Sequence, residues 1–116
     1  MMYGKELILD LHHCDAAAFT KTSIADWFGA VCKATDMEPI RQEWWESYGH
    51  DQPHLNGITA VQFISTSSIT IHSSVDTRQA HINVFTCKDF DPAVVREITR
   101  NWFKGSIVGE VVLGRP

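Results

Sequence analysis

The chain has 116 residues, of which 44% are hydrophobic and 21% are charged, a mixture typical of one compact domain in a chain too short for two. Fourteen acidic and ten basic side chains give a net charge of −4, which argues against the continuous basic face of a nucleic-acid-binding protein. The apolar runs are far shorter than the roughly 20 residues of a membrane span, and three cysteines cannot all pair in disulfides, so we expect a soluble, cytoplasmic protein with neither nucleic acid nor membrane as a partner.

The first half of the chain contains one predicted helix between two predicted strands. Residues 6–12 mix apolar and polar side chains and follow a glycine, as a half-buried strand does. From Ser23 onward, apolar side chains recur at helical spacing, and Ser23 with Asp26 resembles a capping box. Residues 41–48 fit either a strand or a helix end; we favour a strand, followed by a loop over 49–57 that is rich in turn formers.

The second half contains four predicted strands, over residues 58–65, 69–73, 80–87 and 107–113. We expect the first three to pair as antiparallel neighbours. Between the third and the fourth, Asp91 and Pro92 begin a second helix as N-cap and first-turn proline. Gly105 is placed to end that helix.

This order of elements predicts an α+β two-layer sandwich: a mainly antiparallel sheet with two helices on one face, in a single domain over residues 1–116. Each helix has one apolar stripe, which is enough to cover one face of the sheet. The other face is then left to find a partner.

Three residues stand out as candidates for chemistry. Ser67 lies at a strand junction, His72 follows five residues later, and Cys87 lies near the end of a neighbouring strand. They supply the types needed for a nucleophile, an acid–base group and a proton donor. Because His72 lies on the polar face of its strand, we expect its side chain to reach the turn that begins the strand. By composition alone, such residues are also ordinary hydrogen-bonded strand side chains.

The order and spacing of these residues resemble the bacterial and archaeal S-adenosylmethionine decarboxylase family. Those small pyruvoyl enzymes carry the signature Glu-Ser-His-Ile-x-Ile-His and, further on, Phe-Thr-Cys. In this chain the serine is Ser67, the histidine five positions later is His72, and the cysteine twenty positions later is Cys87. The resemblance includes residues 4–15, which look like the opening strand of the family, and Thr59, which stands where the family has a serine.

The resemblance implies that the chain cuts itself between Thr66 and Ser67. The Ser67 hydroxyl would attack the Thr66 carbonyl, with Thr59 and His72 assisting this processing step. Ser67 would thereby become a pyruvoyl group, which forms a Schiff base with a substrate amine and acts as an electron sink, so that no metal is required. Cys87 would then return a proton to the substrate.

The resemblance also implies a homodimer, with two sites at the interface that each draw residues from both copies. Two acidic residues are candidates for binding the small-molecule substrate. Asp76 keeps the acid of the family segment Thr-Trp-Pro-Glu, which here reads Ser-Ser-Val-Asp, and Asp10 matches an acidic position in the first strand.

Three positions depart from the family pattern: Thr66 replaces a glutamate, Ser68 a histidine and Ser74 a tryptophan. We interpret the chain as a self-processing decarboxylase of S-adenosylmethionine, acting in spermidine biosynthesis. Ser74 keeps open a pyruvoyl decarboxylase of another amino acid, such as ornithine or arginine. Thr66 and Ser68 keep open a homologue that never cleaves and acts as a binding or regulatory partner.

Two other motifs have simpler interpretations. His12, His13 and Cys14 are consecutive, so on a strand their side chains point to opposite faces, and no second pair follows at zinc spacing. Trp44 and Trp45 are either core residues or a stacking surface for a substrate.

Overall fold

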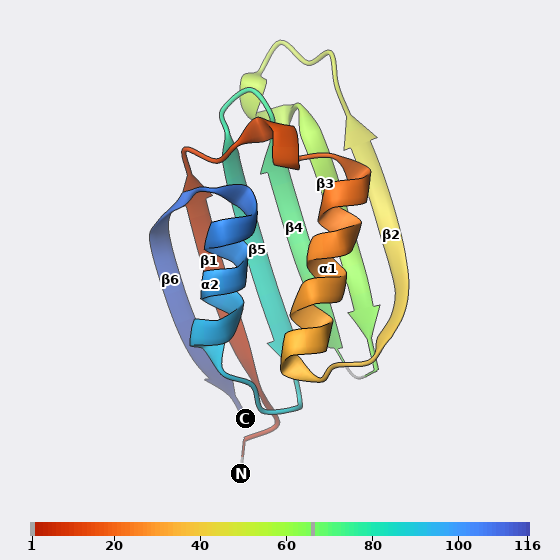
Figure 1. Ribbon diagram of the computed structural model, residues 1–116, viewed down its shortest axis with the longest axis vertical. Helices are drawn as coiled ribbons and strands as arrows, with labels where there is room; N and C mark the ends of the chain where they lie inside the picture. Colours follow the sequence, from red (N-terminus) through yellow and green to blue (C-terminus); the bar gives the residue numbers. More distant parts are fainter. Residues whose placement is uncertain (1, 66) are drawn as a thin grey trace.

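The computed structural model describes residues 2–65 and 67–116, and its strands form one six-stranded sheet. In chain order the elements are β1 (Gly4–His12), α1 (Lys21–Thr35), β2 (Pro39–Ser47), β3 (Gly57–Ile64), β4 (Ser67–Ser74), β5 (Gln79–Thr86), α2 (Pro92–Phe103) and β6 (Ser106–Arg115), with short 3₁₀ turns at Ala16–Ala18 and Pro53–Leu55. The strands lie in the order β2-β3-β4-β5-β1-β6, and every neighbouring pair is antiparallel (Figure 1).

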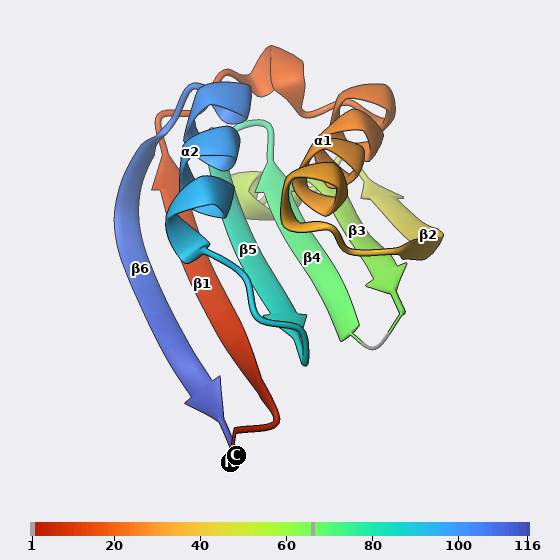
Figure 2. The ribbon, with the colours of Figure 1, turned by 60° about the horizontal axis from the view of Figure 1, so that its bottom comes forward.

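Both helices cover the same face of the sheet and leave the other face open (Figure 2). The predicted two-layer α+β sandwich is therefore confirmed, as is the antiparallel pairing of the three central strands. Strand alternation decides which side chains meet the helices. In β1, for example, Leu7, Leu9 and Leu11 are fully buried beneath them, whereas Ile8 and Asp10 face the open side.

The core between sheet and helices is built on aromatic side chains. The rings of Trp27 in α1 and Phe103 in α2 have their centroids 5.4 Å apart, and Phe19 lies 5.5 Å from Phe103. Trp27 also donates a hydrogen bond from Nε1 to the buried hydroxyl of Thr99, at 3.2 Å. These contacts join the two helices.

Among the described residues, no helix is long and apolar enough to cross a membrane.

Helix α1 begins earlier than its sequence pattern predicts. Its N-cap is Thr20, whose Oγ1 accepts a hydrogen bond from the backbone N–H of Ser23 at 3.1 Å. The predicted capping box of Ser23 and Asp26 is therefore wrong, because Ser23 is the residue being capped. A short polar turn that precedes the apolar stripe is easily missed by a pattern that follows apolar spacing.

Helix α2 begins as predicted and ends one residue early. The Asp91 carboxylate accepts from the N–H of Ala93 at 2.9 Å, and Pro92 occupies the first turn. At the other end Lys104, not Gly105, adopts the left-handed conformation, with φ 53°. Gly105 is needed for space instead, since a Cβ there would lie 2.7 Å from the sulfur of Cys14.

The segment over 41–48 is confirmed as a strand, which is β2 and ends at Ser47. Its two tryptophans face opposite ways. Trp44 is half-buried on the helix side, with its ring 6.0 Å from that of Phe28, whereas Trp45 is 71% exposed on the open face. Trp44 is thus a core residue, and Trp45 lies on the surface.

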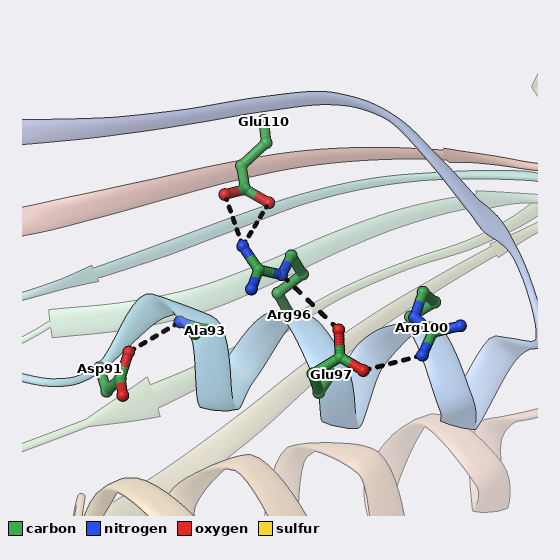
Figure 3. A network of polar contacts seen from close by, with 6 residues as sticks. All are labelled: Asp91, Ala93, Arg96, Glu97, Arg100 and Glu110. Carbon is green, nitrogen blue, oxygen red and sulfur yellow. Dashed lines mark hydrogen bonds and ion pairs between the residues drawn. The ribbon is translucent and has the colours of Figure 1, made fainter.

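Arg96 of helix α2 forms an ion pair with Glu110 of the edge strand β6 and belongs to a small network of charged residues (Figure 3). Arg96 donates to both carboxylate oxygens of Glu110 on β6, at 3.1 and 3.4 Å, and also pairs with Glu97. Glu97 in turn accepts from Arg100 at 2.8 Å. The pairs are partly exposed, so each contributes little to stability.

We expect Phe103→Ala to lower the free energy of unfolding by about 3 to 5 kcal/mol, because the deletion opens a cavity between the two helices. Urea unfolding followed by circular dichroism measures this loss. The control is Val108→Ala on β6, where the side chain is 54% exposed, and a change below about 0.5 kcal/mol is expected. Equal losses for both variants would contradict this description of the core.

Candidate active site

Ser67 and Cys87 lie side by side at one end of the sheet. Ser67 is the first residue of β4, and Cys87 directly follows the neighbouring strand β5. The backbone N–H of Cys87 donates a hydrogen bond to Ser67 Oγ at 3.1 Å, and both residues are half-buried. The structure thus brings the predicted nucleophile to the predicted proton donor. Thr66, predicted to supply the cleaved carbonyl, lies outside the described residues.

A cavity of about 330 Å³ opens beside Cys87. It is lined by Met2, Tyr3, Gly4, Lys5, Cys87, Lys88, Asp89 and Gly114. The ring of Tyr3 stacks on that of Phe85, with centroids 6.1 Å apart and planes 24° apart. This volume is in the range of sites for small organic ligands, and its aromatic wall suits a flat ring.

Thr59 and His72 form a second pair, on the open face of the sheet. They are direct partners in the register of β3 and β4, and Thr59 Oγ1 lies 3.1 Å from His72 Nδ1. A hydroxyl bonded to an imidazole is an arrangement that can accept and pass a proton. The structure therefore brings together the two residues predicted to assist processing.

The two pairs are separated along β4. Ser67 and His72 are five residues apart on an extended strand, which corresponds to about 16 Å at roughly 3.3 Å per residue. Alternation also places them on opposite faces, because Ser67 shares the parity of buried Ile69. The prediction that His72 reaches the turn at the start of its own strand is therefore wrong within one chain.

A further polar pair continues the line of Thr59 and His72 across the sheet. His72 is the register partner of His81 on β5, and His81 is the partner of Asp10 on β1. Asp10 Oδ1 lies 2.7 Å from His81 Nδ1. Sequence reasoning singled out Asp10 and missed His81, although the alternation of His81 with buried Ile82 already placed it on the polar face.

Asp76 and Ser74 lie where β4 ends, away from Ser67. The Asp76 carboxylate accepts a hydrogen bond from Asn56 at 2.8 Å, which anchors the loop before β3. Ser74 is buried beneath that loop and donates to the carbonyl of Pro53 at 3.2 Å. The position at which the family signature has tryptophan is therefore filled by a small residue under a loop.

Comparison with known proteins relates the chain to one family and to solved structures. The family model described as S-adenosylmethionine decarboxylase matches residues 5–115. The crystal structure of the adenosylmethionine decarboxylase from Aquifex aeolicus superposes with a TM-score of 0.82, covering 98% of this chain and 91% of that chain at 21% sequence identity. No curated protein sequence matches.

The other two thiols are held in environments that keep them protonated. Burial raises the pKa of the Cys14 thiol to about 11, although the charge of Arg78 acts in the opposite direction. Burial likewise raises the pKa of Cys32, which lies on the core face of α1.

Across residues 2–65 and 67–116, no group of three His, Cys, Asp or Glu side chains is arranged to hold a metal ion, and His12, His13 and Cys14 form no such group.

We expect iodoacetamide at about pH 8 to modify Cys87 first in the native protein, because the thiolate is the reactive form and the other two thiols are buried. Mass spectrometry of digested protein identifies the labelled residue. Cys87→Ser should abolish the fast phase, and all cysteines should react once the chain is unfolded. Fast labelling of Cys14 would contradict its burial.

Proposed function

Because the chain belongs to the S-adenosylmethionine decarboxylase family, we propose that it is a self-processing, pyruvoyl-dependent decarboxylase of S-adenosylmethionine that serves spermidine biosynthesis. The observation that carries this proposal is the 3.1 Å hydrogen bond from the Cys87 amide to Ser67 Oγ. It holds the hydroxyl that would be converted against the backbone of Cys87, the residue whose thiol would donate a proton and which lines a cavity of suitable size.

In the proposed self-cleavage, Ser67 Oγ attacks the carbonyl carbon of Thr66, so that an ester replaces the amide bond. Elimination across the Cα–Cβ bond of Ser67 then releases residues 1–66 with a new carboxylate and leaves a dehydroalanine at residue 67. Water hydrolyses the imine tautomer of this residue, which releases ammonia and gives the pyruvoyl carbonyl. The attack requires a base for the hydroxyl proton, and the elimination requires a base for the α proton. The Thr59–His72 pair is suited to this work, because its imidazole is oriented by a hydroxyl at 3.1 Å.

We propose that Thr59 and His72 act on Ser67 of a second copy of the chain. The separation of about 16 Å along β4 prevents direct proton transfer within one chain. Ser67 is the first residue of β4, so it lies at the end of the sheet, and a partner packed in the opposite direction on the open face would bring its His72 around that end toward this Ser67. Exposed apolar side chains on that face favour such a homodimer; they are Trp45, Phe63, Val111 and Leu113.

The remaining residues have roles in turnover. The pyruvoyl group at residue 67 supplies a carbonyl that withdraws electrons from the substrate as carbon dioxide leaves. Cys87 Sγ would return a proton to the substrate α-carbon. Tyr3 offers an aromatic face to the adenine ring or the sulfonium cation of the substrate. Asp76 and Asp10 would contribute negative charge from the partner.

Denaturing mass spectrometry of the purified protein tests self-cleavage, with Ser67→Ala as the uncleavable control. We expect two fragments, residues 1–66 and 67–116, from the unchanged chain and one intact species from the variant. Release of carbon dioxide from S-adenosylmethionine, compared with ornithine and arginine, then identifies the substrate.

Each result leads to a different conclusion. Cleavage with turnover of ornithine or arginine alone would overturn the substrate assignment while keeping the pyruvoyl chemistry. An intact chain in both samples would overturn the enzyme and leave the binding or regulatory homologue.

A mixing experiment tests the shared site. Ser67→Ala and His72→Ala chains are synthesised separately and together, with a tag that distinguishes them. We expect no cleavage of either alone, and cleavage of the His72→Ala chain in the mixture, up to about half of it if subunits pair at random. If the unchanged protein cleaves but the mixture does not, the two pairs do not act across an interface.

A further inference from the structure

The open face carries a lateral row of four polar side chains from four neighbouring strands: Thr59 of β3, His72 of β4, His81 of β5 and Asp10 of β1. Self-cleavage as described above uses only the first two. We propose that His81, oriented by Asp10, is the proton donor in the same self-cleavage. This inference rests on the proposed function.

His81 is held as an acid–base imidazole usually is. Its Nδ1 lies 2.7 Å from Asp10 Oδ1, which fixes the ring and directs Nε2 to the opposite side. In this orientation Nε2 is the ring nitrogen that can exchange a proton with a reacting group. Both side chains are about half exposed in the single chain, at 49% and 43%, so a molecule packed on this face can reach them.

His72 has a different hydrogen-bond partner. Its Nδ1 lies 3.1 Å from the hydroxyl of Thr59, whereas His81 is paired with a carboxylate. Directly opposed residues on neighbouring strands have Cβ atoms about 4.5 to 5.5 Å apart. The register of His72 with His81 thus places a proton acceptor and a proton donor side by side.

The first step of self-cleavage needs both functions at once. As Ser67 Oγ bonds to the carbonyl carbon, its proton leaves and is taken by His72 of the second copy. As the bond from that carbon to the Ser67 nitrogen breaks, the nitrogen gains a proton, which His81 of the same second copy supplies. One proton is removed and one is delivered, so the step balances without any other reactant.

Other charged groups on this face are engaged elsewhere. Glu6, two residues before Ile8 on β1, accepts from Asn83 at 2.8 Å and from Arg115 at 2.6 Å. His12 lies beyond Asp10 on the same strand, with its ring 6.3 Å from that of His13. Asp10 is therefore the carboxylate that orients His81.

Cleavage of the freshly synthesised full chain, followed over time on denaturing gels, tests the role of His81. We expect His81→Ala to slow cleavage about 100-fold, as loss of a general acid does, and Asp10→Asn to slow it about tenfold. Added imidazole should restore part of the rate in His81→Ala and leave the unchanged chain unaffected. The matched control is His12→Ala, which should cleave at the normal rate.

His81→Gln separates chemistry from packing, because glutamine can still donate a hydrogen bond to Asp10 and cannot transfer a proton. We expect it to be as slow as His81→Ala. A normal rate for His81→Gln, or a slow His81→Ala that imidazole does not rescue, would overturn the inference while leaving the proposed function standing. An unchanged chain that never cleaves would overturn both.

Discussion

The register of β4 between β3 and β5 is the constraint on which the rest of the structure depends. It sets Thr59 opposite His72 on one side and His81 opposite His72 on the other, and it brings the end of β5, with Cys87, to Ser67. A slip of one residue would turn His72 into the core and bring an isoleucine to the open face. The buried isoleucines Ile69 and Ile71 prevent such a slip, so core packing also determines which polar side chains meet on the open face.

The two faces of the sheet carry different kinds of side chain. The helix side holds the aromatic core, and its thiols, Cys14 and Cys32, are kept protonated by burial. The open side carries histidines and carboxylates, which would be costly to bury without partners. It also carries exposed apolar side chains. Stability and reactivity can therefore change almost independently, because successive residues of one strand serve different faces.

Local periodicity predicted most of this fold, because helices and half-buried strands each produce a characteristic spacing of apolar residues. It missed the start of α1, because the N-cap there is the polar residue Thr20. It also misjudged His72, because five residues of extended strand place its side chain far from Ser67. Non-local pairing was beyond it altogether. Asp10 and His81 are 71 positions apart, and only the insertion of β1 between β5 and β6 makes them neighbours. The similarity to a family pointed to Ser67 and Cys87 as candidate site residues but carried no information about His81.

The strand order has a consequence for a chain cut between residues 66 and 67. The amino-terminal piece would contribute β2, β3 and β1, and the carboxy-terminal piece β4, β5 and β6, so the two pieces would alternate within one sheet. Three seams would join them, β3 to β4, β5 to β1 and β1 to β6, and α1 would still pack on α2. The two pieces would therefore stay associated after cleavage, because separating them requires breaking the backbone hydrogen bonds of all three strand pairs.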